Sequence, residues 1–444
     1  MVTPILSADG ALPHPIVNDP FRARKITTPV STKTWNFTLS IEKTKLMKIK
    51  NFSLYLLLII LAIGCGPKET PAPANKYLVS ATLVATNEKD KVAADIGGAL
   101  GGLQGTFIQS FVRFGIKQIT ITYNTVNSDG TPIAASGALF VPISPANSTE
   151  TFPLASIQHG TIFDDALAPS KFNIRSEALT GYLLSSTGYI VAMPDYIGYG
   201  ASNALPHPYE HRESLAQSSL DMSRAVKEYI TKEKLVWNKN YYIGGYSEGG
   251  FASMSLLKLI EEKYPTEFTI KAASLGSGAY DKTAFTKFVA ANKTTPQAQF
   301  NQSYLWVILT YDRIYKLNRA LNTYFKEPYA TQITASKQNT QIALPMTDIL
   351  NDDFKKAVIA GTDAAFLNAV KDNDCFDWKP KTPVRLYYGT ADDYVFPFNS
   401  QNAYKAMQAK GATNVALVPI ADKNHSTAIQ DFLLGTLDFF GSNK

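Results

Sequence analysis

From about residue 116 onward, short apolar runs alternate with longer stretches in which apolar residues recur every three or four positions. The short runs are rich in Val, Ile, Tyr and Phe and end at Gly, Pro or Asp, which is typical of buried strands, whereas the longer stretches have the period of amphipathic helices. This alternation predicts an α/β fold with a mostly parallel central sheet flanked by helices. The predicted strands are 117–126, 134–142, 153–160, 189–195, 240–246, 270–276, 384–390 and 415–420, and the predicted helices include 211–230 and 247–264.

One long interval interrupts the alternation. Between residues 281 and 381 the pattern indicates helices only, for example over 303–321 and 352–370. A connection of about a hundred residues between two strands is far longer than the usual few residues. The sequence therefore predicts a helical cap at 281–381, inserted between two parts of one core at 77–280 and 382–444.

The N-terminal part has a different pattern. Lys48 and Lys50 precede an apolar run at 52–63, which is too short to span a bilayer comfortably, and Cys65 follows directly after a glycine. This arrangement resembles a bacterial lipoprotein signal that is cleaved before a cysteine, which then carries the lipid.

The expected organisation of this part follows from that resemblance. We expect 47–64 to be the signal peptide and 65–76 to hold the lipidated Cys65 and an extended tether. Because a signal peptide begins its chain, residues 1–46 are interpreted as a non-native upstream extension. The expected partner is a membrane, reached through the lipid on Cys65. The expected location is the bacterial cell envelope, on the outer or the inner membrane, and Lys68-Glu69 resembles the surface-export signal of some lipoproteins.

Charge and cysteine content narrow the remaining choices. The net charge of +6 comes mainly from residues 1–50, which hold eight Lys or Arg and three Asp or Glu, and the rest of the chain carries about +1. Nothing therefore favours nucleic acid as a partner. The chain has two cysteines, so with Cys65 acylated we expect Cys375 to form no intramolecular disulfide.

A candidate nucleophile lies at Gly245-Tyr246-Ser247-Glu248-Gly249, a G-x-S-x-G pattern. The pattern alone is weak, but a predicted strand precedes it and a predicted helix follows it. A nucleophilic serine on a tight strand-to-helix turn requires this context, with small neighbours that leave room for the turn. The alternative is an ordinary serine in a Gly-rich loop.

A serine hydroxyl needs a histidine to take its proton and a carboxylate to orient that histidine. Of the five histidines, only His425 lies after a suitable acid downstream of Ser247. The acid is expected just after the strand that ends near Gly389, where Asp392 is the preferred candidate and Asp393 the alternative. All three groups then follow predicted strands.

An oxyanion hole would complete the site. One donor is expected from the backbone N–H of Glu248, and the other from the loop at Gly160 and Thr161. His159 is expected to shape this loop rather than to act as the base. The same loop could be a simple turn.

The motifs together resemble the α/β-hydrolase superfamily and, within it, the secretory lipase family, which is known from fungi and has bacterial relatives. Over roughly 77–444, the resemblance is carried by "ITYNTVNSDGTPIAASGALFVP", "PDYIGYGAS", "HPYEHRESLAQSSLDMSRA" and "GSGAYD". It implies an α/β-hydrolase fold with the helical cap inserted before the strand that carries the acid. It also implies esterase or lipase activity on a small ester substrate, a Ser247–Asp392–His425 triad, and neither metal nor organic cofactor.

The leading hypothesis is therefore hydrolysis of carboxylic esters through an acyl-serine intermediate. Two alternatives remain open: a peptidase related to the prolyl oligopeptidase group, which has the same triad order, and a catalytically inactive surface protein that binds a lipid or a glycan. The sequence shows neither the N-terminal propeller nor an acidic cluster of the kind such peptidases use.

Overall fold

The computed structural model describes residues 75–145 and 148–444. The predicted upstream extension, the predicted signal peptide, Cys65 and most of the predicted tether lie outside the described residues. Within the described part of the chain, no helix combines the length and the apolarity needed to cross a bilayer.

A nine-stranded sheet forms the centre of the fold, in the order β1-β2-β3-β5-β4-β6-β7-β8-β9. The pairs from β1 to β5 are antiparallel, and every pair from β5 to β9 is parallel, which confirms the predicted mostly parallel sheet. The strands are β1 (Leu78–Asn87), β2 (Ile116–Val126), β3 (Pro132–Pro142), β4 (Phe152–Gln158), β5 (Ile190–Pro194), β6 (Trp237–Tyr246), β7 (Thr269–Gly276), β8 (Val384–Gly389) and β9 (Val415–Ile420).

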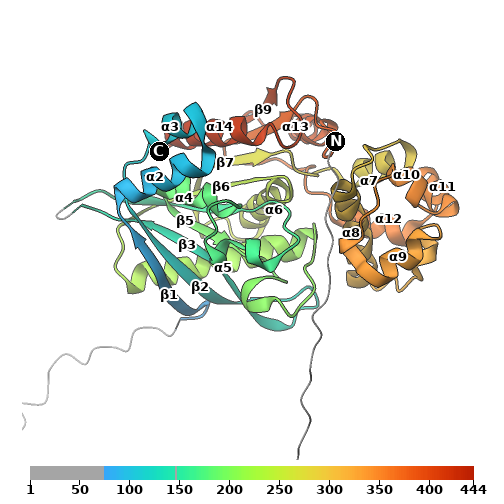
Figure 1. Ribbon diagram of the computed structural model, residues 1–444, viewed down its shortest axis with the longest axis horizontal. Coiled ribbons are helices and arrows are strands. Elements are labelled where there is room, and N and C mark those ends of the chain that lie inside the picture. The colour runs from blue at the N-terminus through green and yellow to red at the C-terminus, as the bar shows by residue number, and fades with distance from the viewer. Residues whose placement is uncertain (1–74, 146–147) are drawn as a thin grey trace, which may run out of the picture. The chain divides into compact units, whose positions relative to one another are not determined.

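Helices cover both faces of the sheet (Figure 1). Successive side chains of a strand point to opposite faces, so Ile190 and Ala192 pack into one core while Val191 and Met193 pack into another. The first core includes α5 (Arg212–Lys232), α6 (Glu248–Lys263) and α13 (Phe398–Ala409). The second includes α2 (Lys89–Leu100), α3 (Gly102–Gln109), α4 (Ala178–Ser186) and α14 (Ile429–Ser442). Both faces of β4 and β5, and of most of β6 to β8, are therefore buried, whereas β9 at the edge is only partly buried.

Between β7 and β8 the chain leaves the sheet and forms a group of helices beside it (Figure 1). These helices share an apolar core of their own, which includes Leu305, Tyr311 and Phe366. They are α7 (Lys282–Ala291), α8 (Ala298–Ile314), α9 (Tyr329–Ser336), α10 (Met346–Ile349), α11 (Asp352–Ala360) and α12 (Ala364–Asp372). We call α7 to α12 the cap helices.

Three elements differ from the expected pattern. The helix predicted over 303–321 is α8, which ends at Ile314, and the positive φ angles of Lys316 and Asn318 are incompatible with its continuation. The helix predicted over 352–370 is divided at Gly361, which has φ 77°, and Asp363 begins α12 by accepting from the Phe366 N–H at 3.2 Å. Strand β1 was not predicted, because most of its residues are exposed and show no apolar alternation. It is one of the two edge strands of the sheet and pairs only with β2.

Candidate active site

Ser247 occupies a strained turn between β6 and α6. Its φ of 60° and ψ of −123° lie in a region that side-chain-bearing residues rarely adopt. The turn is held by backbone bonds on both sides. The Ser247 N–H donates to the Gly276 carbonyl at 2.9 Å, and the Ser247 carbonyl accepts from the Phe251 N–H at 3.1 Å. The sheet and the helix together therefore hold the serine in this conformation.

Close approach of α6 to β4 explains the glycines around the serine. A Cβ atom added at Gly249 would run into the Gln158 carbonyl oxygen, and one added at Gly245 would run into the same atom and into Gly249. Any side chain at either position would push the helix away from the strand. The first turn of α6 therefore lies against the carboxyl end of β4, and Ser247 lies at that end of the sheet.

His425 connects Ser247 to Asp392. Its Nε2 atom lies 2.9 Å from the Ser247 Oγ, and its Nδ1 atom lies 2.7 Å from the Asp392 Oδ2. The other Asp392 oxygen accepts two backbone N–H groups, from Tyr394 at 3.0 Å and Val395 at 2.9 Å. The Asp392 side chain has no exposed surface, so this carboxylate is fixed by three donors in a dry environment.

The neighbouring Asp393 points elsewhere. Its Oδ2 atom accepts from the Thr295 hydroxyl, in the segment between α7 and α8, at 2.8 Å. Of the two adjacent carboxylates, Asp392 bonds His425, whereas Asp393 connects the loop between β8 and α13 to the segment between α7 and α8.

Two loops of the site also form hydrogen bonds with each other: the acid loop between β8 and α13, which holds Asp392, and the histidine loop between β9 and α14, which holds His425. The Ala391 N–H donates to the Lys423 carbonyl at 3.0 Å, and the Tyr246 hydroxyl donates to the His425 carbonyl at 2.6 Å. A Cβ atom at Gly389 would collide with Lys423, so the end of β8 touches the histidine loop directly. Residues that are far apart in sequence are thereby held at hydrogen-bonding distance.

Tyr394 is a site residue that the sequence analysis missed. Its ring meets the His425 ring edge to face at 4.9 Å and stacks on Phe300 at 4.1 Å. Its hydroxyl donates to Ser303, and burial raises the pKa of Tyr394 to about 12. Its position two residues after the acid was the only available signal.

The loop after β4 lies beside the serine. The Gly160 N–H donates to the Glu177 carboxylate at 3.2 Å, and the Thr161 hydroxyl bonds the Tyr209 hydroxyl at 2.9 Å. The His159 ring lies between two carbonyl oxygens, with Nδ1 2.7 Å from Gly160 and Nε2 3.1 Å from Asp195. His159 therefore braces the loop and has no contact with Ser247.

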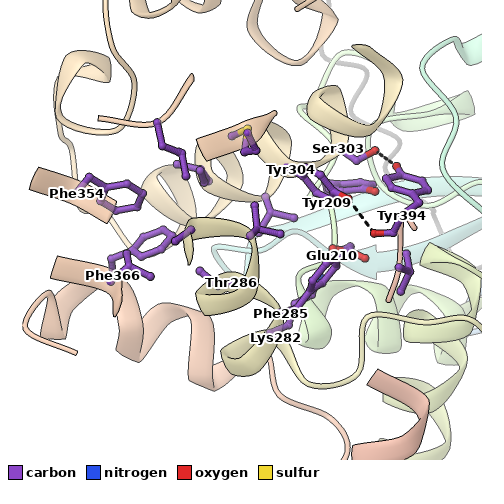
Figure 2. A pocket seen from close by; sticks show the side chains of 18 of the residues that line it. Tyr209, Glu210, Lys282, Phe285, Thr286, Ser303, Tyr304, Phe354, Phe366 and Tyr394 are labelled. Atoms are coloured by element: carbon purple, nitrogen blue, oxygen red, sulfur yellow. Dashed lines mark hydrogen bonds and ion pairs between the residues drawn. The ribbon is translucent and has the colours of Figure 1, made fainter. Parts of the chain in front are cut away.

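Two cavities meet at Ser247 and Tyr394, which line both of them. The first has an empty volume of about 700 Å³ and extends among the cap helices, where its walls are mostly aliphatic and aromatic (Figure 2). The second, of about 970 Å³, includes polar side chains such as Gln158, Thr161 and Glu177. Within the described residues, no group of three or more His, Cys, Asp or Glu side chains could hold a metal ion.

Glu248, directly after the serine, belongs to a buried pair. Its Oε1 atom lies 2.7 Å from the His207 Nε2, and the two side chains are 2 % and 3 % exposed. The His207 Nδ1 lies 2.7 Å from the Ile197 carbonyl, which can only accept, so Nδ1 carries a hydrogen. The His207–Glu248 hydrogen bond therefore needs a second hydrogen: either Glu248 is a neutral carboxylic acid or His207 is an imidazolium.

The nine-stranded sheet, the strained serine and its bonded histidine and carboxylate define an α/β-hydrolase. The chain belongs to the secretory lipase family, whose family model matches residues 167–431, more than half of the chain. The protein is accordingly a carboxylic ester hydrolase. This family membership supports neither of the two alternatives, the peptidase and the inactive binding protein. Membership of a secretory family indicates an extracellular or envelope protein.

Solved structures share the fold. A candidate hydrolase from Legionella pneumophila is 25% identical, with a TM-score of 0.73 over 82% of this chain and 98% of that one. The rice cell wall degrading esterase LipA from Xanthomonas oryzae is 23% identical, with a TM-score of 0.71 over 84% and 100%. Candida antarctica lipase A in its closed state is 17% identical, with a TM-score of 0.56 over 82% and 83%. A comparison with curated protein sequences gave no match.

The buried pair makes a prediction about stability. Glu248→Ala leaves His207 buried without its Nε2 partner, and breaking such a pair on one side costs about 3–5 kcal/mol of the free energy of unfolding. Glu248→Gln keeps the shape and supplies an amide N–H for Nε2, so we expect its free energy of unfolding to lie within about 1 kcal/mol of the wild type. Urea unfolding of the two variants measures the difference. Equal destabilisation by Ala and Gln would show that the hydrogen bond is not what matters.

Proposed function

We propose that the protein hydrolyses carboxylic esters through an acyl-serine intermediate, with Ser247 as the nucleophile, His425 as the general base and Asp392 as the orienting carboxylate. The observation that carries this proposal is the position of the His425 ring, 2.9 Å from the Ser247 Oγ on one side and 2.7 Å from Asp392 on the other. A nucleophile, a base and an orienting group within hydrogen-bond reach are what acyl transfer to serine requires.

Each group has one task in this mechanism. Asp392 accepts the Nδ1–H of His425, which leaves Nε2 free to take the Ser247 proton as Oγ attacks the ester carbonyl carbon. The resulting imidazolium gives that proton to the departing alcohol, and the acyl group remains on Ser247. Water then attacks the acyl-serine with His425 again as the base, releasing the acid and restoring the serine.

The developing negative charge needs backbone donors. Glu248 is the first residue of α6, so its N–H has no acceptor within the helix and is available to the oxyanion. For the second donor we propose the Thr161 N–H rather than that of Gly160, which already donates to Glu177. In a trans peptide the carbonyl and the next N–H point in opposite directions. Because the Gly160 carbonyl is turned towards His159, the Thr161 N–H is directed away from it.

The acyl group is assigned to the cavity among the cap helices. Its walls include Phe285, Val289, Ile308 and Phe366. Burial of an alkyl chain there would gain about 0.8 kcal/mol for each methylene group. The alcohol half is assigned to the second, more polar cavity.

Ser247→Ala is expected to reduce kcat on p-nitrophenyl esters by about 10⁴-fold or more, because the nucleophile is lost while the fold is kept. The assay uses a series from acetyl to palmitoyl, with the best rates expected at chain lengths that fill the cap cavity. Ser255→Ala, two turns further along α6, removes a similar hydroxyl outside both cavities and is the matched control. Comparable rates for Ser247→Ala and the wild type would refute the assignment of the nucleophile.

The two adjacent carboxylates give a second test. Asp392→Asn is expected to lower kcat by about 10⁴-fold, because the histidine loses the acceptor that fixes its tautomer. Asp393→Asn should lower kcat less than tenfold, since Asp393 bonds Thr295 and not His425. Initial rates on one p-nitrophenyl ester measure both variants. A larger loss for Asp393→Asn would transfer the role to that residue.

We also propose that a lipid on Cys65 anchors the protein to a membrane of the bacterial cell envelope, with residues 47–64 as the cleaved signal. The sequence pattern around Cys65 supports this proposal. The full chain and its Cys65→Ala variant, expressed in a bacterium fed labelled palmitate, test it. The wild type should carry label and sediment with membranes, while Cys65→Ala should carry none and leave the membrane fraction. Identical labelling and fractionation of the two proteins would reject the anchor.

A further inference from the structure

A buried ion pair interrupts the mostly apolar wall of the cap cavity. Lys282, the first residue of α7, donates to Glu210, which lies in the loop before α5, and both line the cavity that Ser247 also lines (Figure 2). Their side chains are only 2 % and 8 % exposed. Two charges removed from water lose more solvation than a single contact restores unless further hydrogen bonds are made.

The hydrogen bonds of this pair are incomplete. A lysine ammonium has three N–H donors, yet within the described residues the only acceptor for Lys282 is one Glu210 oxygen. The Oε1 atom of Glu210 has no donor within the same part of the chain. The rings of Phe251 and Phe285 lie 5.0 Å and 5.9 Å from the ammonium nitrogen and offer no oxygen. A free donor and a free acceptor therefore lie side by side at the cavity wall.

The electrostatic setting favours a neutral ligand group. Burial lowers the pKa of Lys282 to about 7, although Cys375 and Asp374 act in the opposite direction. A ligand carboxylate would face the Glu210 carboxylate, which already shares the Lys282 ammonium. A hydroxyl group suits both partners, because it accepts from the amine and donates to the carboxylate.

We propose that Lys282 and Glu210 form a recognition point for a hydroxyl group on the acyl chain, so that the preferred substrates are esters of hydroxylated aliphatic acids. This inference rests on the proposed function, since it assigns the acyl group to the cap cavity. The hydroxyl accepts a hydrogen bond from the Lys282 Nζ and donates one to the Glu210 Oε1.

The position of the pair limits where the hydroxyl lies along the chain. Phe251, whose ring lies beside the ammonium, is one helical turn from Ser247, and one turn rises about 5.4 Å. Phe354 and Phe366 lie at the opposite end of the cavity from Tyr394 (Figure 2). The hydroxyl is therefore bound within the first several carbons from the ester, and the aliphatic remainder occupies the space near these two phenylalanines.

The test compares ethyl hexanoate with ethyl 3-hydroxyhexanoate and ethyl 6-hydroxyhexanoate in a pH-stat assay of kcat/KM. We expect the wild type to favour at least one hydroxy ester over the plain ester by about tenfold. In a purely apolar cavity the sign would be opposite, since an unpaired hydroxyl is costly to bury. The matching methoxy ester has no hydrogen to donate to Glu210, so it should lose the preference, and this arm needs no protein variant.

Protein variants then assign the preference to the pair. Lys282→Met/Glu210→Gln removes both charges at nearly constant shape and should prefer the plain ester. Lys355→Met/Asp352→Asn removes an ion pair of α11 that lies outside the cavity, and it should keep the wild-type ratio. Thermal unfolding confirms that both double variants are folded.

The outcomes separate this inference from the proposed function. Hydrolysis of all the esters, with no preference for a hydroxyl at either position in the wild type, would overturn the inference and leave the ester hydrolase intact. The same hydroxyl preference in the wild type and in folded Lys282→Met/Glu210→Gln would also overturn it. Failure of the folded wild type to hydrolyse any ester would overturn both.

Discussion

The rest of the site depends on one constraint, the positive φ of Ser247. A serine in this conformation is unfavourable in isolation, so the surrounding structure must impose it. It does so by pressing the start of α6 against the end of β4, with no room for a Cβ atom at Gly245 or Gly249. The stability of the sheet thus maintains the strain. In return, the turn projects the hydroxyl towards His425 and leaves the first N–H groups of α6 uncovered.

A single short loop connects this turn to the cap helices. His207 bonds Glu248, the residue after Ser247, and three residues later Glu210 bonds Lys282 at the start of α7. His211 then begins α5 by accepting from the Ser214 N–H. The cap helices return two bonds to the same loop, from Arg313 to the His207 carbonyl and from Tyr311 to the Glu210 carbonyl. Movement of the cap helices would therefore be transmitted to Glu248 and so to the start of α6.

The features that could be predicted from the sequence are those that depend on the local pattern of apolar residues. The parallel strands β6 and β9 appear in the sequence as apolar runs, and Ser247 and His425 each follow one of them, so the fold class and a serine–histidine candidate could be inferred. Edge strand β1 could not, because it buries little surface. The partners of Glu248 and Lys282 could not be predicted either. His207 lies 41 positions from Glu248 and Glu210 lies 72 positions from Lys282, and no periodicity in the sequence indicates such distant contacts. Tyr394 was overlooked because its role depends on where the His425 ring lies.

This division explains why the chemistry is easier to infer than the substrate. The reacting groups must meet within about 3 Å, so the strand ends and glycines that bring them together leave little freedom in sequence. A cavity that encloses an acyl group, by contrast, can be built from many combinations of apolar side chains. Against that permissive background, a buried charged side chain is more informative than another phenylalanine, because its desolvation has to be offset by a specific contact. Lys282 and Glu210 are therefore the residues of the cavity wall whose identity says most about the molecule that occupies it.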